Sequence, residues 1–169
     1  IICHNVPASA ISYLSCLQNR IVPFLIDAEM DDTLKAQLLD LYKPNYIFCP
    51  KKGRPQEISL YDIDTYGIYC AYKHTHRLYK DLALLLTTSG STGSPKLVRQ
   101  SYANIQSNAT SIAQYLHLTS EERPISTLPM HYTFGLSVIN SHVLCGASEV
   151  LTESTVFEPF FWDTCKKNK

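Results

Sequence analysis

The chain has 169 residues, of which 45% are hydrophobic and 18% are charged, enough to form the core of one domain or part of a larger one. Its 15 basic and 15 acidic residues give a formal net charge of zero, which argues against a dedicated nucleic-acid-binding protein. The longest apolar stretches are well short of the roughly 20 residues that cross a bilayer, so we expect no membrane span.

The cysteines indicate a reducing compartment. The chain has six of them, at wide and irregular gaps and without a C-x-x-C pair, and several stand inside apolar runs. No signal peptide is visible, so we expect a cytoplasmic protein with free thiols. The chain begins "IICHNV" without Met and ends "FWDTCKKNK" just after the start of an amphipathic helix, and we interpret both ends as cuts through a larger protein.

The first 50 residues alternate between helical and extended patterns. Apolar spacing predicts a helix over about residues 8–19, followed by a short strand in "IVPFLID". Acidic residues open a second helical pattern over residues 31–42, and "PNYIFCP" is again strand-like. This order predicts an α/β protein with a largely parallel sheet covered by helices.

The patterns after residue 50 predict further strands and helices. "EISLYDID" and "GIYCAY" are typical of strands or a hairpin, "LALLLTT" of a buried strand and "KLVRQS" of a short return strand. Ser101 is placed to cap a helix over about residues 102–116. "PISTLP" is strand-like, "GLSVINSHVLCG" is helical with its end at Gly146, and "SEVLT" is strand-like.

A loop of small and hydroxylated residues, "TSGSTGSPK" at 88–96, stands between the predicted strands "LALLLTT" and "KLVRQS". Glycines let the backbone approach a ligand closely, and successive backbone N–H groups form an anion-binding nest. Lys96 adds a positive charge, so the loop predicts binding of a phosphate chain. It is not a Walker A loop, because Pro95 precedes the lysine and a strand pattern follows it.

This loop resembles the signature loop of the acyl-adenylate-forming superfamily, whose members include acyl-CoA synthetases, adenylation domains of nonribosomal peptide synthetases, and luciferases. The resemblance implies an α/β fold of mixed, mostly parallel sheets flanked by helices. Residues 1–169 would be a fragment of the large N-terminal AMP-binding domain, with the C-terminal domain absent.

The resemblance also implies the chemistry. The family uses ATP and Mg²⁺ to convert a carboxylic acid to an acyl-AMP with release of pyrophosphate, usually before transfer to a thiol of CoA or a carrier protein. It implies that Lys96 is the catalytic charge partner. The phosphate-binding residues that it implies are Thr88, Ser89, Gly90, Ser91, Thr92, Gly93 and Lys96.

A second segment, "STLPMHYTFGLSVINSHVLCGASEVL" at 126–151, resembles the family segment in which a proline precedes an aromatic residue or His, and Gly-Leu opens a helix. Tyr132 stands where many members have a histidine that lines the carboxylate pocket, and His131 precedes it. We therefore expect Tyr132 and Gly135 in the substrate pocket, with ordinary packing as the alternative for Tyr132 and His131. One departure from the family is Leu97, where a glycine often follows the lysine.

Other functions stay open on the sequence. No second ligand cluster accompanies the histidines near residues 73–76, so we expect no metal held by protein side chains alone. The family's ribose-binding acid, its Thr-Glu pair and its mobile C-terminal lysine come later than the segment present here. The alternatives are a non-catalytic nucleotide- or partner-binding module derived from such an enzyme, and an unrelated phosphate-binding α/β protein.

Overall fold

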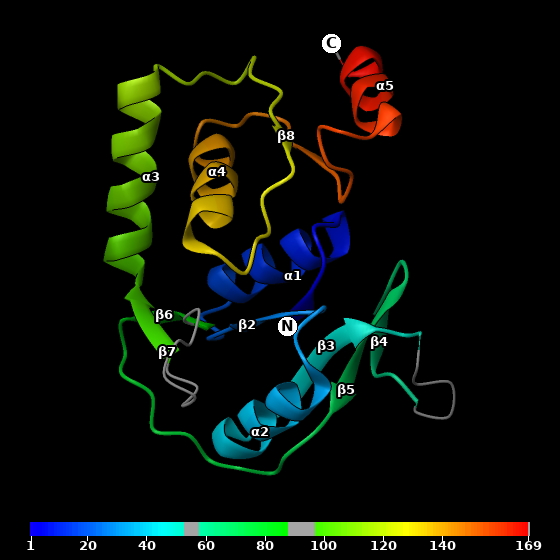
Figure 1. Ribbon diagram of the computed structural model, residues 1–169. Coiled ribbons are helices and arrows are strands. Elements are labelled where there is room, and N and C mark those ends of the chain that lie inside the picture. The colour runs from blue at the N-terminus through cyan, green and yellow to red at the C-terminus, as the bar shows by residue number, and fades with distance from the viewer. Residues whose placement is uncertain (53–57, 88–96, 169) are drawn as a thin grey trace.

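The structure is a computed structural model that describes residues 1–52, 58–87 and 97–168. Among these residues the largest sheet has four strands, in the order β1-β2-β6-β7. β1, β2 and β6 run parallel, and β7 pairs antiparallel with β6 (Figure 1). The strands are β1 (Ile2–Cys3), β2 (Phe24–Asp27), β6 (Leu82–Thr87) and β7 (Leu97–Ser101).

A second sheet is entirely antiparallel within the described residues, with the order β3-β5-β4. The strand predicted at residues 44–50 belongs to this sheet, so the expectation that it continues a parallel sheet is wrong. Its partner is the second strand of the predicted hairpin, over the register from Tyr46↔Cys70 to Pro50↔Tyr66. The strands are β3 (Tyr46–Pro50), β4 (Tyr61–Ile63) and β5 (Tyr66–Cys70).

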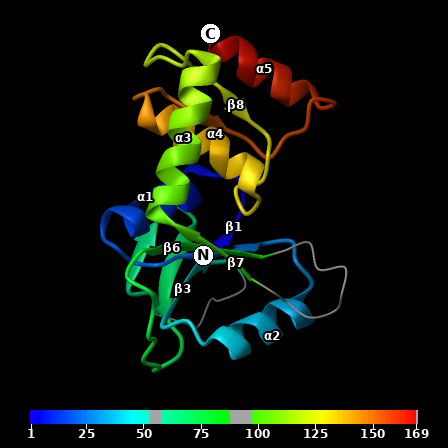
Figure 2. The same ribbon diagram turned by 90° about the vertical axis from the view of Figure 1, so that its left-hand side faces the viewer.

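The predicted α/β class with mixed sheets is confirmed, and helices cover both faces of the four-stranded sheet. Figure 2 shows α2 on one side of this sheet and α1, α3 and α4 on the other. A short parallel pair, β8 with β9, lies near α4 and α5 (Figure 1). The bounds are α1 (Pro7–Gln18), α2 (Asp32–Tyr42), α3 (Tyr102–Leu116), β8 (Ile125–Ser126), α4 (Thr133–Leu144), β9 (Val150–Leu151) and α5 (Pro159–Lys167).

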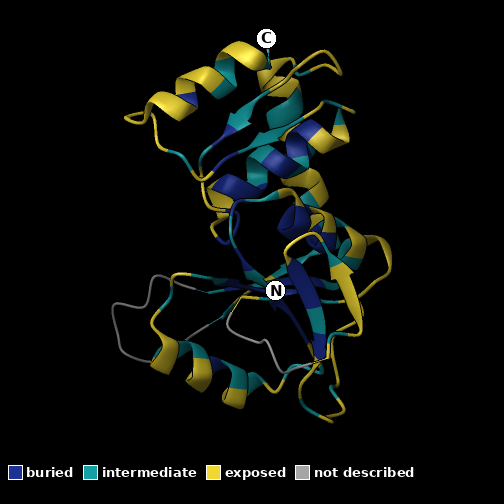
Figure 3. Ribbon diagram, turned by 90° about the vertical axis from the view of Figure 1, so that its right-hand side faces the viewer, coloured by how far each residue is buried: buried dark blue, intermediate teal, exposed yellow. Residues whose placement is uncertain are grey.

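The core forms on the two faces of the parallel strands because successive side chains of a strand alternate between them. Leu25 and Leu84 pack with Tyr13 of α1 and Ile139 of α4. The neighbouring residues of the strands pack against α2, where the buried cluster comprises Phe24, Ile26 and Leu38. Figure 3 shows the buried sheet and the largely exposed surface of α2 and α5.

Local hydrogen bonds and backbone conformation determine where α3 begins and where α4 ends. The Ser101 hydroxyl accepts a hydrogen bond from the Asn104 N–H at 3.1 Å, and the Asn104 side chain accepts one from the Ser101 N–H at 3.1 Å. This reciprocal pair is a capping box and confirms Ser101 as the cap of α3. Gly146 has a φ of +74°, two residues after the end of α4, as expected of a glycine after a helix.

The six cysteines are free, as expected from their spacing. Cys3 and Cys49 are buried, and burial raises the pKa of Cys3 to about 12. A thiol with so high a pKa is a poor nucleophile at neutral pH, so Cys3 is a packing residue. In the described part of the chain, no helix has the length and apolar character required to span a bilayer.

Candidate functional site

The carboxyl ends of the parallel strands define the candidate site. Because β1, β2 and β6 are parallel, Cys3, Asp27 and Thr87 all lie toward the same edge of the sheet. In open α/β sheets, ligands bind outside this edge. β6 ends at this edge with Thr87, and residues 88–96 follow it directly in the sequence.

The predicted phosphate-binding residues themselves lie outside the described residues. Their attachment points are described: Thr87 and Leu97 are paired across the antiparallel β6–β7 ladder. The chain therefore leaves β6 at Thr87 and enters β7 at Leu97, and these two residues are direct neighbours in the ladder. The predicted phosphate-binding residues that lie outside the described residues are Thr88, Ser89, Gly90, Ser91, Thr92, Gly93 and Lys96.

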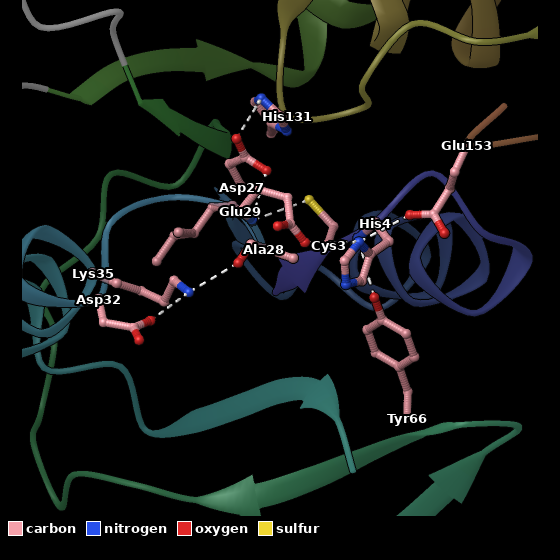
Figure 4. Close-up of polar contacts among 11 residues, drawn as sticks. Cys3, His4, Asp27, Ala28, Glu29, Asp32, Lys35, Tyr66, His131 and Glu153 are labelled. Atoms are coloured by element: carbon pink, nitrogen blue, oxygen red, sulfur yellow. Dashed lines mark hydrogen bonds and ion pairs between the residues drawn. The ribbon is translucent and has the colours of Figure 1, made fainter. Parts of the chain in front are cut away.

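His131 and Asp27 meet at this edge. Figure 4 shows the two side chains pointing toward each other, with His131 Nε2 3.7 Å from Asp27 Oδ2. That distance is too long for a hydrogen bond. Burial lowers the pKa of His131, and the Asp27 carboxylate offsets this only in part. His131 is therefore neutral at physiological pH, so its contact with Asp27 is not an ion pair there.

Tyr132 is exposed, whereas the neighbouring His131 is buried. Its side chain is 49% exposed, and its ring lies against the His131 ring with centroids 4.3 Å apart. The Tyr132 N–H donates to the Pro129 carbonyl at 3.1 Å, which sets the turn that opens α4. The structure thus places the expected pocket residue at the start of α4, beside a histidine that packs inward.

Gly135 has a packing role that the structure makes explicit. A Cβ on Gly135 would lie 2.3 Å from the Pro129 carbonyl oxygen and 2.8 Å from the Leu128 carbonyl oxygen. Distances below 3.0 Å are essentially never seen for real Cβ atoms. Glycine at this position therefore lets the first turn of α4 approach the preceding turn of backbone, whatever else it contacts.

A cleft of about 640 Å³ lies between β7, α3 and the first half of α4. Neither Tyr132 nor Gly135 is among its described lining residues, although their neighbours Thr133, Phe134 and Leu136 are. The first lining residue in sequence is Val98, two residues after Lys96 at the end of the predicted phosphate loop. Its other lining residues are Val98, Arg99, Gln100, Asn104, Ile105, Asn108, Ile112, Ser137 and Asn140.

Two residues that the sequence did not single out connect β1 to the β8–β9 pair. The buried Asn5 side chain donates to the Ser126 carbonyl at 2.7 Å and to the Thr152 carbonyl at 3.0 Å. His4 Nδ1 lies 2.9 Å from Glu153 Oε1 (Figure 4). Nothing in the local sequence marks Asn5, because its acceptors lie 121 and 147 residues away.

His4 is also the centre of a small polar cluster. Its Nδ1 is 3.8 Å from Glu29 Oε1, and its backbone N–H donates to the Tyr66 hydroxyl at 3.0 Å. Over residues 1–52, 58–87 and 97–168, no group of three or more His, Cys, Asp or Glu side chains is arranged to hold a metal ion. The polar contacts of His4 thus join the sheet edge to Glu29 and Tyr66.

The AMP-binding enzyme family matches residues 1–169, and the chain belongs to this family. The 2-succinylbenzoate–CoA ligase of Bacillus velezensis is 41% identical over 71 residues, which are 42% of this chain and 15% of that protein. The sulfoacetate–CoA ligase of Cupriavidus necator is 32% identical over 80 residues, which are 47% of this chain and 16% of that protein.

Solved structures confirm the fold. O-succinylbenzoate coenzyme A synthetase from Bacillus subtilis, in complex with ATP and magnesium ion, has a TM-score of 0.68 at 20% sequence identity. The match covers 97% of this chain and 46% of that chain. The sequence thus spans less than half the length of that protein, and the fold resemblance holds over nearly all of what is present.

Proposed function

We propose that these residues supply the ATP phosphate-binding loop and one wall of the acid site of an ATP-dependent ligase. The ligase converts a carboxylic acid to an acyl-AMP with release of pyrophosphate and then forms a thioester with CoA or a carrier-protein thiol. The observation that carries the proposal is that β6 ends at the same edge of the sheet as β1 and β2, and that residues 88–96 follow β6 directly in the sequence. Family membership supports it.

The proposed reaction requires little acid–base catalysis from the protein. A carboxylic acid is already ionised at neutral pH, so the nucleophile needs no general base. Catalysis then consists of holding the carboxylate in line with the α-phosphorus and stabilising the charge that builds on the departing pyrophosphate. Under this proposal, Lys96 and the backbone donors of the loop provide that stabilisation.

ATP and Mg²⁺ are the proposed cofactors. The edge of a parallel sheet followed by a loop rich in Gly, Ser and Thr fits a phosphate chain. We assign no described residue as a magnesium ligand, because the part of the chain that is described has no suitable cluster. Magnesium is commonly held by substrate phosphates with only one or two protein carboxylates, so a dense protein cluster is not required.

The acid site is proposed to lie against α4. The start of the helix brings Tyr132 and Phe134 to the surface at 49% and 67% exposure, and the cleft beside them is lined by both apolar and polar residues. Gly135 would act there indirectly, by letting the helix approach the preceding turn. Tyr132 would contact the acid as the family position implies.

The domain assignment is also a proposal: residues 1–169 form part of an N-terminal AMP-binding domain, and the remaining catalytic groups belong to a longer native protein. The measurement is the intact mass of the protein from its native source. We expect a mass far above the 19.1 kDa of this sequence. A mass near 19.1 kDa would instead favour the alternative, a non-catalytic module that binds a nucleotide or a partner.

The decisive test of the loop is Lys96→Ala in the complete native protein, assayed by acid-dependent ATP–pyrophosphate exchange. We expect exchange to fall by about 100-fold or more, since removing one preorganised charge-stabilising donor costs roughly 10²–10³ in rate. The matched control is Lys80→Ala, which removes an exposed lysine before the start of β6 and should leave exchange unchanged. Unchanged exchange in Lys96→Ala would remove Lys96 from the mechanism.

A further inference from the structure

Strand register decides which side chains of β7 face the cleft between β7, α3 and α4. Val98 pairs with Leu86, and Gln100 pairs with Leu84. Leu84 and Leu86 belong to the core cluster that also contains Leu136 of α4, so they lie on the face of the sheet that α4 covers. Residues directly opposite each other in a ladder share a face, and Val98 and Gln100 therefore line the cleft with their side chains.

Arg99 is the only charged residue among the described lining residues, and its side chain belongs to the opposite face. It pairs with Leu85, which packs on the cluster of Phe24, Ile26 and Leu38 against α2. Successive side chains of a strand point to opposite faces, so the Arg99 guanidinium is directed toward α2 and away from the cleft. The other described lining side chains are apolar groups, amides and hydroxyls, which carry no formal charge.

Asn140 lies on the face of α4 that borders the cleft. Thr133 and Ser137 line the cleft from the same helix, and residues at this spacing of three and four share one helix face. Asn104 and Asn108 of α3 line it from the other side, and Figure 2 shows α3 and α4 on the same side of the sheet. The amide of Asn140 therefore stands about two turns of helix beyond the start of α4.

The Tyr13 hydroxyl determines which end of the Asn140 amide is turned to the cleft. It donates to Asn140 Oδ1 at 3.1 Å. Tyr13 is fully buried in the core, and burial raises its pKa to about 12, so the hydroxyl keeps its proton and can donate at neutral pH. Asn140 Nδ2 has no hydrogen-bond partner within the described residues and is not an enclosed atom. Its two N–H groups are thus open to the cleft.

An open pair of amide N–H groups selects a ligand with a hydrogen-bond acceptor. A carbonyl or hydroxyl oxygen satisfies such a donor without the burial of a charge, whereas a carboxylate would lose its hydration with no cationic side chain in the described lining. The apolar part of the lining, which includes Ile105, Phe134 and Leu136, suits a hydrocarbon body. The cleft therefore fits an apolar body with an uncharged acceptor.

The position of Asn140 along α4 sets where that acceptor must lie. From Thr133 to Asn140 the helix rises about 10 Å, which an extended eight-carbon acid spans. The proposed acid site begins at Tyr132, at the start of the same helix, so the carboxylate of the acid would lie there. The acceptor that reaches Asn140 is then near the far end of the acid.

We propose that Asn140 selects acids whose apolar body carries an uncharged acceptor oxygen, of a ketone or a hydroxyl, about 10 Å from the carboxylate. This inference rests on the proposed function, since it names the class of acid that the ligase takes. Asn140 is then a specificity-determining residue, and Tyr13 is a positioning residue that acts through it. Neither residue takes part in the displacement at phosphorus.

The test compares acids that differ by one carbonyl oxygen. ATP–pyrophosphate exchange in the complete native protein is measured with 7-oxooctanoate against octanoate, and with 3-(4-acetylphenyl)propanoate against 3-(4-ethylphenyl)propanoate. We expect kcat/KM to be at least about tenfold higher for the oxo acid of one or both pairs, because a site built to bond a substrate group rejects an analogue that lacks it. The pair 4-oxopentanoate and pentanoate should differ by less than about twofold, because that carbonyl lies too near the carboxylate to reach Asn140.

Substitutions show whether that preference depends on the fixed amide. Asn140→Asp keeps the shape of the side chain and replaces its two N–H groups by an acceptor oxygen, so the ratio of kcat/KM for the oxo acid and its parent should fall to about one. Asn140→Ala, which adds no charge, should give the same result. Tyr13→Phe removes the hydroxyl that orients the amide and should lower the ratio by about threefold or more.

The ratio compares two acids on the same protein, so a general loss of stability does not change it. Gln106→Glu makes the same amide-to-carboxylate change on the exposed surface of α3, outside the described cleft lining, and should leave the ratio intact. A ratio that is unchanged in both Asn140 variants overturns the proposal, as does the absence of a preference in the unsubstituted protein. A ratio that is unchanged in Tyr13→Phe overturns the positioning role of Tyr13.

Direct binding separates this inference from the proposed function. Titration calorimetry with 7-oxooctanoate and with 3-(4-acetylphenyl)propanoate, without ATP, is done on the unsubstituted protein and on Asn140→Ala. Binding that depends on Asn140, without exchange for any acid, would refute the ligase assignment and uphold the contact with Asn140. Exchange that is equal for oxo acids and their parents would uphold the ligase and overturn the contact. Neither binding nor exchange would overturn both.

Discussion

Substitution of Gly135 by alanine tests the packing at the start of α4. The added Cβ would lie 2.3 Å from the Pro129 carbonyl oxygen and 2.8 Å from both the Leu128 carbonyl oxygen and the Pro129 carbonyl carbon. All three are backbone atoms, so no flexible side chain can move aside. Overpacking of this kind costs about 1–3 kcal/mol and occasionally more, and a rigid backbone obstacle places Gly135→Ala at or above the upper end of that range.

A second effect acts in the opposite direction. Gly135 lies within α4, and alanine is favoured over glycine in a helix by about 1 kcal/mol. The net expectation is a loss of roughly 2 kcal/mol in the free energy of unfolding. For a domain of this size, 1 kcal/mol corresponds to about 2–4 °C, so Tm should fall by about 4–8 °C.

The assay is thermal denaturation followed by circular dichroism, with urea denaturation as the second measure. Ser137→Ala is the matched control, because it lies in the same helix and adds no atom while removing only a hydrogen bond to the Phe134 carbonyl. Its stability should change by less than about 0.5 kcal/mol. A Gly135→Ala variant with unchanged or raised Tm would show that the turn at 128–129 yields, and the packing explanation for the glycine would be wrong.

Two further predictions concern stability. Ser101→Ala removes the side-chain half of the α3 capping box and should cost about 1 kcal/mol, seen as a Tm about 2–4 °C lower, whereas Ser107→Ala on the exposed surface of the same helix should have almost no effect. Burial raises the pKa of Glu149 from 4.5 to about 7, so the folded state is favoured while this carboxyl is protonated, and its contribution is lost as pH rises from about 4.5 to 7. Glu149→Gln should therefore raise Tm at pH 8 and have little effect at pH 4.5; equal Tm shifts at both pH values would exclude titration of Glu149 as the cause.

Most of the secondary structure could be predicted because its signals are local. The helix expected at residues 102–116 is α3 over the same range, capped by Ser101 as its hydroxyl and position imply. The helix expected at residues 8–19 is α1, shifted by one residue at each end. In both, apolar spacing and end residues act within a few turns, so no distant part of the chain has to be known.

Strand partners were less predictable. The apolar run at residues 44–50 forms β3, but its partner is β5 and the pairing is antiparallel. A short apolar strand looks the same in either kind of sheet, because burial on both faces removes the alternation that would distinguish them. The sequence placed the strand correctly and gave no information on its neighbour.

For the candidate site, the chemistry is a prediction from the sequence alone, because residues 88–96 lie outside the described residues. The order of Gly, Ser, Thr, Pro and Lys at residues 88–96 carries the phosphate-binding prediction, because those residue types act through their own backbone and side-chain groups. Only the tertiary structure decided which distant groups meet. It turned His131 inward to Asp27, and it required glycine at position 135 to clear the Pro129 carbonyl. It also brought β7, α3 and α4 together around one cleft. Contacts of this kind depend on how the backbone packs across long separations in sequence, and no local pattern of residues encodes them.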